Sequence, residues 1–266
     1  QGNELVVTGT GGLPKNDCKK IDVGNSGTSL RILTGLASLA DFPIIFDGDN
    51  SIRKRPMMPL LSALEQIGAS VQSTDGRCPF TITGPIKGGQ TTVNGISSQF
   101  LTSLLLATPL AMSNTEIVVE NLHEKPYVEM TLDWLRKLNI QFEHDGLDRF
   151  RIFGGQKFEA FRKSIPADFS SATFAACAAA VTGSEILIKG LDFADHQGDK
   201  DIFTFLEEMG TEIKHVPEGV IITGGELRGI DIDMNSTPDA LPAFAVTGCF
   251  AEGTTRLLNV AQARLK

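Results

Sequence analysis

The sequence predicts an α/β fold built from repeats of about 70 residues in which strands and helices alternate. Three helical segments align along the chain, with leucines at equivalent positions 71 residues apart: Leu64, Leu135 and Leu206. A strand that ends in glycine follows each segment, with isoleucines 70 residues apart: Ile82, Ile152 and Ile222. Because period and order agree in three copies, we interpret the chain as a repeat protein.

Each repeat is expected to contain two helices. In the second, apolar residues recur at helical spacing, as in Ile202, Phe205, Leu206 and Met209. These helices end on residues that tolerate the left-handed conformation: Gly68, Asn139 and Gly210. The first helices are expected to begin near Ser26, Ser97, Ser170 and Pro238. Strands should follow them at residues 44–46, 116–119, 185–188 and 256–258.

The repeat also predicts the boundaries. Residues 4–9 resemble the strand that closes a block, and the fourth block stops at Lys266 after its first strand. We therefore expect a piece of a longer protein, incomplete at both ends; degenerate terminal repeats are the alternative. A proline-containing link at residues 163–167 predicts a boundary between two domains, residues 1–165 and 166–266.

Composition excludes several classes of protein. The chain has 266 residues, 41% of them hydrophobic, and a net charge of −8. We therefore do not expect a disordered tail or a general nucleic-acid binder. No apolar run reaches about 18 residues without interruption by polar groups, which argues against a membrane span. The four cysteines and four histidines are scattered without metal-ligand spacing. We expect no metal, no disulfide framework and, with no signal-peptide pattern at residue 1, a cytoplasmic protein.

The starts of the first helices carry the candidate chemistry. Residues 24–31 (GNSGTSLR) combine small residues, hydroxyls and an arginine, a composition suited to an anion at a helix N-terminus. Ser97, Ser98 and Gln99 open the second such helix. Asp168 and Ser170 open the third, and Asp239 lies at the fourth, where it could accept hydrogen bonds from ligand hydroxyls or take a proton. Ordinary N-caps are the alternative in each case. Together these helix starts suggest that the ligand is a phosphorylated, hydroxylated small molecule.

Three adjacent cations, Arg53, Lys54 and Arg55, follow the first strand of their block. Such a run is commonly a solvated loop, but arginine is the forked donor that suits phosphate and carboxylate. We expect at least one of the three to bind a ligand. The comparable loop of the next block contains Tyr127, the only tyrosine of the chain.

These segments resemble the 5-enolpyruvylshikimate-3-phosphate synthase family. Residues 24–31 resemble its GNxGTxxR segment, residues 53–57 its R-x-R-P loop and residues 97–101 its S-S-Q-[FY]-L segment. Further matches follow in the family's order at residues 125–127, 168–172, 238–239 and 264–266. The resemblance implies two domains of three βαβαββ units each. It also implies transfer of the enolpyruvyl group of phosphoenolpyruvate to the 5-hydroxyl of shikimate 3-phosphate, in the shikimate pathway to aromatic amino acids. No cofactor, nucleic acid or membrane is implied, and we expect a monomer.

The resemblance also assigns roles. Shikimate 3-phosphate would be held by Ser97, Ser98, Gln99 and Tyr127, with Gln99 also reaching phosphoenolpyruvate. Arg55 would bind phosphoenolpyruvate, beside a floor formed by Gly27 and Thr28. Asn25 is a further candidate substrate-binding residue. Gly27 matches the glyphosate-sensitive pattern of the family. Asp239 and Lys266 would be catalytic, Asp239 as proton acceptor.

Two positions depart from the family pattern. Gln262, a candidate substrate-binding residue, stands where asparagine is common. Glu124 stands where many members have serine, and we leave it out of the site because an acid would repel phosphate.

The family's lysine-serine motif would precede residue 1, and further arginine and lysine ligands would follow residue 266. We therefore expect the chain alone to turn over poorly. Two rival functions stay open: the sister transferase acting on UDP-N-acetylglucosamine, and a non-catalytic βα-repeat binding module.

Overall fold

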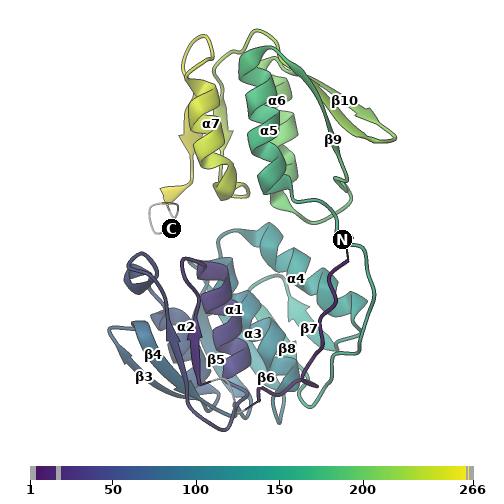
Figure 1. Ribbon diagram of the computed structural model, residues 1–266. Coiled ribbons are helices and arrows are strands. Elements are labelled where there is room, and N and C mark those ends of the chain that lie inside the picture. Colours follow the sequence, from purple (N-terminus) through teal and green to yellow (C-terminus); the bar gives the residue numbers. More distant parts are fainter. Residues whose placement is uncertain (1–3, 16–18, 262, 264–266) are drawn as a thin grey trace. The chain divides into compact units, whose positions relative to one another are not determined.

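The computed structural model describes residues 4–15, 19–261 and 263, which form two compact units (Figure 1). The first unit comprises residues 1–122 and 131–160, and the second comprises residues 123–130 and 161–266. The division after residue 160 lies close to the boundary expected after residue 165. In addition, the short segment 123–130, which contains Tyr127, groups with the second unit.

The first unit contains two four-stranded sheets of identical topology. The first has the order β1-β2-β4-β3, with β1 (Lys20–Asp22), β2 (Ile44–Asp47), β3 (Ser70–Thr74) and β4 (Arg77–Thr83). The second has the order β5-β6-β8-β7, with β5 (Gly89–Asn94), β6 (Thr115–Glu120), β7 (Phe142–Asp145) and β8 (Arg149–Ile152). In each sheet the first two strands are parallel and the other pairs are antiparallel. Two βαβαββ units therefore follow one another.

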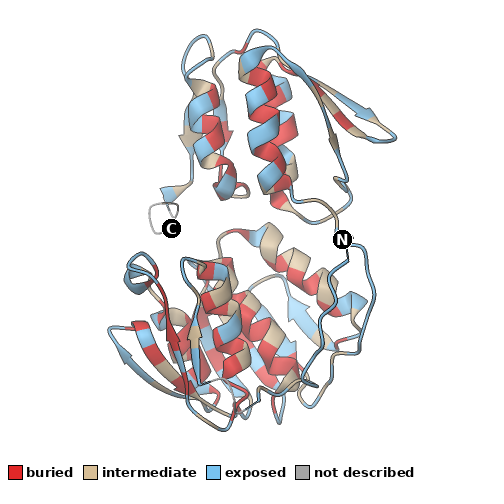
Figure 2. Ribbon diagram, viewed as in Figure 1, coloured by how far each residue is buried: buried red, intermediate tan, exposed pale blue. Residues whose placement is uncertain are grey.

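Helices connect these strands. The α-helices are α1 (Gly27–Ala37), α2 (Met58–Gln66), α3 (Ser98–Ala107) and α4 (Lys125–Lys137). Two short 3-10 helices, η1 (Ile52–Lys54) and η2 (Thr108–Leu110), accompany them. Figure 2 shows buried residues along the helices and the strands of the sheets.

The second unit continues the pattern with fewer strands. An antiparallel sheet has the order β10-β11-β9, with β9 (Glu185–Lys189), β10 (Glu212–Val216) and β11 (Gly219–Thr223). A parallel pair is formed by β12 (Asp231–Asp233) and β13 (Arg256–Leu258). The helices are α5 (Phe169–Thr182), η3 (Gly198–Asp201), α6 (Ile202–Met209), η4 (Pro238–Ala240) and α7 (Leu241–Gly248). Within the described ranges no helix is long and apolar enough to cross a membrane.

The predicted repeat is confirmed. The strands expected around Ile82, Ile152 and Ile222 are β4, β8 and β11. The residues after the second helices adopt positive φ, +109° at Gly68, +58° at Asn139 and +112° at Gly210, as the expected left-handed endings require.

The strand predicted at residues 4–9 is wrong. Residues 4–10 have no regular secondary structure, and Leu5, Val6 and Val7 are 87%, 79% and 77% exposed. An apolar run becomes a strand only where a neighbouring strand takes up its backbone hydrogen bonds, and sequence pattern alone does not supply that neighbour.

Helices α1 and α3 pack closely in the core of the first unit. A Cβ placed on Gly35 of α1 would lie 2.3 Å from Oγ of Ser103 on α3. The Ser103 hydroxyl donates a hydrogen bond of 2.7 Å to the backbone oxygen of Arg31. The absence of a side chain at Gly35 therefore permits the two helix axes to approach, which places the starts of α1 and α3 next to each other.

The second unit has its own core. Phe169, Ile202, Leu206 and Phe244 are fully buried there, with aromatic edge contacts that join Phe169 to Phe203 at 6.0 Å. This core fixes the N-terminal ends of α5 and η3, which carry the polar residues described below.

Candidate functional site

The N-terminus of α1 is capped by the hydroxyl of Ser26. Ser26 occupies the N-cap position with extended backbone, and its Oγ accepts a hydrogen bond of 3.1 Å from the amide of Ser29. The N-cap alternative therefore holds for Ser26. The next two residues differ from Ser26 in their surroundings. Gly27 is buried against arginine side chains, and Thr28 is exposed.

Gln99 links the starts of α1 and α3. Its Oε1 accepts a hydrogen bond of 2.7 Å from Nη1 of Arg31, and its Nε2 donates one of 2.9 Å to Oγ1 of Thr28. The Arg31 guanidinium also lies 5.2 Å from the centre of the Phe100 ring. This arrangement fixes the Gln99 amide between a cation and a hydroxyl, so both its donor and its acceptor are oriented before any ligand binds.

The start of α3 differs from that of α1 in its capping. Ser97 occupies the N-cap position with extended backbone, but its side chain makes no capping hydrogen bond. Ser98 is buried, with 1% of its surface exposed. The Ser97 hydroxyl is therefore not used to stabilise the helix, unlike that of Ser26.

Arg55 lies over Gly27 and is held by Asn25. Its Nη2 donates a hydrogen bond of 3.3 Å to Oδ1 of Asn25, whose Nδ2 donates one of 2.8 Å to Oδ2 of Asp49. A Cβ on Gly27 would lie only 2.4 Å from Nη1 of Arg55. Among the described residues, no acceptor pairs with the buried Nε of Arg55. Arg55 is thus oriented by one weak contact and retains donors for an anion.

Arg53, two residues earlier, has a structural role. Its Nε and Nη2 donate two hydrogen bonds of 2.9 Å to the Asp47 carboxylate. The Arg53 hydrogen bond, followed by one from the Gly48 amide, lowers the pKa of Asp47 to about 2. Of the three cations expected to include a ligand-binding residue, the geometry favours Arg55, because Arg53 is committed to Asp47.

In the second unit, Asp199 on η3 is the centre of a buried polar cluster. Its Oδ2 accepts a hydrogen bond of 3.0 Å from the Tyr127 hydroxyl and another, very short, from the Ser170 hydroxyl. Asp199 is only 2% exposed. Burial raises the pKa of Asp199, and burial together with the negative charges of Asp199 and Asp239 raises that of Tyr127 well above its ordinary value.

Asp168 is the N-cap of α5. Its carboxylate accepts hydrogen bonds of 3.1 Å and 3.0 Å from the amides of Ser170 and Ser171. Burial acts to raise the pKa of Asp168, but the hydrogen bonds from Ser171 and Ser170 outweigh it and the pKa is lowered. Asp239 lies on η4 and is exposed.

The structure thus gathers the predicted residues into two groups. The first unit holds Asn25, Gly27, Thr28, Arg55, Ser97, Ser98 and Gln99 at the starts of α1 and α3 and the loop before α2. The second unit holds Tyr127 and Asp239. Gln262 and Lys266 lie outside the described residues. Glu124, left out of the predicted site, is buried beside the start of α4.

The sequence patterns did not point to Asp49 and Asp199 as partners of site residues, and they indicated Arg31 only as part of segment 24–31, without indicating its contacts. One signal was available for Arg31 and Asp199. The hydrogen bonds Thr28–Gln99, Arg31–Ser103 and Tyr127–Asp199 join residues 71, 72 and 72 positions apart. Adjacent repeats therefore place equivalent helix starts together, and residues one period apart are the ones to pair.

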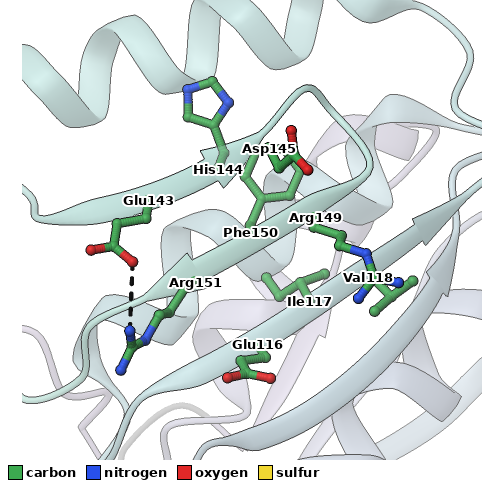
Figure 3. A pocket seen from close by; sticks show the side chains of 9 residues that line it. All are labelled: Glu116, Ile117, Val118, Glu143, His144, Asp145, Arg149, Phe150 and Arg151. Carbon is green, nitrogen blue, oxygen red and sulfur yellow. Dashed lines mark ion pairs between the residues drawn. The ribbon is translucent and has the colours of Figure 1, made fainter.

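A separate hollow of about 320 Å³ lies over strands β6, β8 and β7 (Figure 3). Opposite charges face each other across its strands, Glu116 and Glu143 beside Arg151 and Asp145 beside Arg149. Arg151 pairs with Glu143 at 3.6 Å. None of the predicted site residues lines it, and its three acids outnumber its two arginines, so it does not suit an anionic ligand.

The paired βαβαββ units, with amide, hydroxyl and guanidinium donors gathered at two helix starts, place the chain among the α/β repeat proteins. The chain matches the family described as EPSP synthase (3-phosphoshikimate 1-carboxyvinyltransferase) over residues 1–266, and it belongs to that family.

Curated relatives named 3-phosphoshikimate 1-carboxyvinyltransferase agree with this assignment. The protein from Acetivibrio thermocellus is 48% identical over 99% of this chain and 63% of its own length. That from Ruminiclostridium cellulolyticum is 47% identical over 98% of this chain and 62% of its own length.

The solved structure of EPSP synthase from Acinetobacter baumannii is similar with a TM-score of 0.71 and 28% identity, over 93% of this chain and 58% of that one. The chain therefore spans a little under two thirds of the length of the curated relatives it matches.

Proposed function

We propose that this chain binds shikimate 3-phosphate and phosphoenolpyruvate, and that it serves the transfer of the enolpyruvyl group to the 5-hydroxyl of shikimate 3-phosphate with release of phosphate. The observation that carries the proposal is the Gln99 link between two helix starts, with Arg31 on one side and Thr28 on the other. Two helix N-termini with oriented amide and guanidinium donors suit a phosphorylated ligand.

Within the first unit we assign the two anionic ligands to different donors. Ser97, Ser98 and Gln99 bind shikimate 3-phosphate, which is supported by the absence of a capping bond from Ser97. Arg55 binds phosphoenolpyruvate over the floor formed by Gly27 and Thr28, which is supported by the buried donor that Arg55 retains. Asn25 holds Arg55 in place.

In the second unit we assign Tyr127 to the hydroxylated part of shikimate 3-phosphate and Asp239 to proton acceptance. The exposure of Asp239 on η4 supports the latter role, because a proton acceptor must be reached by substrate. We extend the proposal to Lys266 as a second catalytic residue and to Gln262 as a substrate-binding one, on the match of their segment to the family. The proposal needs no cofactor and places a monomer in the cytoplasm.

Thermal denaturation with and without ligands tests this function. A ligand that binds only the folded chain stabilises it by about 2.7 kcal/mol when its concentration is a hundred times its Kd. We expect shikimate 3-phosphate to raise Tm and UDP-N-acetylglucosamine to leave it unchanged. A rise with UDP-N-acetylglucosamine alone would favour the sister transferase, and a rise with neither would favour a non-catalytic binding module.

A further inference from the structure

Asp199 is a buried carboxyl group whose two oxygens differ in their hydrogen-bond partners. Oδ2 accepts from Tyr127 and from Ser170. Oδ1 is buried and, in the part of the chain that the structure describes, has no hydrogen-bond partner. A buried polar atom without a partner loses its hydration with no hydrogen bond in return, so this group is retained at a cost to stability.

The hydrogen-bond inventory of the two hydroxyls follows from this geometry. A phenol and an alcohol each carry one proton, and both protons are directed at Oδ2 of Asp199. Every further hydrogen bond made by Tyr127 Oη or Ser170 Oγ must then be one that the oxygen accepts. A proton bound to the carboxyl group would reside on Oδ1, so the direction of both bonds is the same in either charge state.

We propose that Asp199 is a positioning residue that fixes the hydroxyls of Tyr127 and Ser170 as hydrogen-bond acceptors, so that they select a hydroxyl group of the ligand and not a phosphate. The ligand part of this inference rests on the proposed binding of shikimate 3-phosphate. The orientation of Tyr127 by Asp199 does not.

The charges near this cluster also favour a hydroxyl group of the ligand over a phosphate. Besides burial, the charges of Asp239 and Asp168 raise the pKa of Asp199, and the charges of Asp199, Asp239 and Glu124 raise that of Tyr127. All of them are acidic, so a phosphate would meet repulsion here as well as acceptors. The cationic donors described above, Arg31 and Arg55, belong to the first unit. The second unit therefore offers an acceptor surface suited to a polyol.

The position of Asp199 is enforced by the backbone around it. A Cβ on the preceding Gly198 would lie 2.4 Å from the backbone oxygen of Ser236 and 3.0 Å from Pro126. Gly198 thus permits η3 to pack against the segment that leads to Tyr127, one repeat away along the chain. This close approach brings the carboxyl group within reach of the phenol.

The single tyrosine of the chain gives a direct test, because every tyrosine signal comes from Tyr127. The Raman Fermi doublet of tyrosine distinguishes a phenol that donates from one that accepts. We expect a donor signature in the wild type and in Asp199→Asn, which keeps an acceptor oxygen, and loss of that signature in Asp199→Leu. Asp201→Asn, an exposed acid on the same element, is the matched control and should leave the signature unchanged.

Binding is measured on the same proteins by calorimetry with shikimate 3-phosphate and by phosphorus NMR with inorganic phosphate. We expect Asp199→Leu to bind shikimate 3-phosphate about tenfold more weakly, as loss of one or two oriented bonds predicts. Inorganic phosphate should bind all variants equally, and Asp199→Asn should restore wild-type binding of shikimate 3-phosphate.

Several results would overturn the inference: a donor signature that survives Asp199→Leu, unchanged shikimate 3-phosphate binding in that variant, or equal losses for both ligands. If Asp199→Leu does not fold, Tyr127→Phe takes its place, and wild-type binding of shikimate 3-phosphate by Tyr127→Phe would likewise contradict it. Failure of the wild type to bind shikimate 3-phosphate would refute the proposed function and the ligand selection together. The Raman result would still decide whether Asp199 orients Tyr127.

Discussion

Arg53 and Arg55 show that neighbouring residues of one type take different roles according to their partners. Arg53 forms a two-point ion pair with Asp47, which itself is only 12% exposed in its side chain. Arg55 makes one long hydrogen bond to Asn25 and keeps a buried donor. The sequence RKR predicts three cations, and only the acceptors around each one decide which of them stabilises the fold and which is available to a ligand.

The Asp47–Arg53 pair should contribute stability that depends on pH. The pKa of Asp47 is lowered from 3.8 to about 2, so this contribution is complete above about pH 4 and is lost as the pH falls toward 2. At neutral pH we expect Asp47→Asn to lower the free energy of unfolding by about 1–2 kcal/mol, since Arg53 is partly exposed.

Urea denaturation at neutral pH and near pH 3 measures this effect, with the exposed Asp41→Asn as control. The loss caused by Asp47→Asn should shrink at the lower pH. A loss of equal size at both pH values would show that the ion pair is not its source.

Gly27→Ala should weaken phosphoenolpyruvate binding in particular. The new Cβ would lie 2.4 Å from Arg55 Nη1, so the guanidinium must move away from its position over residue 27. Calorimetry with phosphoenolpyruvate in the presence of shikimate 3-phosphate should show about tenfold weaker binding, with shikimate 3-phosphate itself little affected. Gly9→Ala, where a Cβ meets nothing within 4 Å, is the control. Equal weakening of both ligands would contradict the assignment of Arg55 to phosphoenolpyruvate.

At the scale of elements, the site of the first unit depends on how closely α1 approaches α3. Gly35 and Ser103 set that approach, and Ser103 also binds the backbone oxygen of Arg31. The Gln99 link lies one turn above this contact, so the spacing of the two helices determines whether Gln99 reaches both Arg31 and Thr28.

Gly35→Ala tests that dependence. Helix propensity alone would make alanine more stable by about 1 kcal/mol. The added Cβ, however, would lie 2.3 Å from Ser103 Oγ and 2.7 Å from its backbone oxygen. We therefore expect a net loss of about 1–2 kcal/mol in urea denaturation, together with weaker binding of shikimate 3-phosphate. A variant more stable than the wild type would show that the helices separate without cost.

Element identity was predictable from sequence where a pattern is local. Helical periodicity, positive-φ endings and the strands around Ile82, Ile152 and Ile222 all follow from spacing within one repeat. Capping was predictable for Ser26 and Asp168 by residue type, but Ser97 has the same type and makes no capping bond. Residues 4–9 show the converse, because an apolar run without a paired neighbour does not become a strand.

At the scale of the whole molecule, both groups of candidate residues are brought together by the packing of consecutive repeats. Contacts between residues one period apart tie Gln99 to Thr28 and Tyr127 to Asp199. Motif resemblance could indicate Gln99 and Tyr127 as candidates, but not that a buried acid would hold the tyrosine. That pairing depends on how consecutive repeats pack in three dimensions, which no single segment of sequence encodes.

Calorimetric titration of the chain with shikimate 3-phosphate, beside UDP-N-acetylglucosamine and the variant Gln99→Ala, tests most directly whether the Gln99 link serves ligand binding. We predict saturable one-to-one binding of shikimate 3-phosphate, about tenfold weaker in Gln99→Ala, and no binding of the UDP-sugar. Binding of UDP-N-acetylglucosamine, no binding of shikimate 3-phosphate, or full affinity in Gln99→Ala would contradict it.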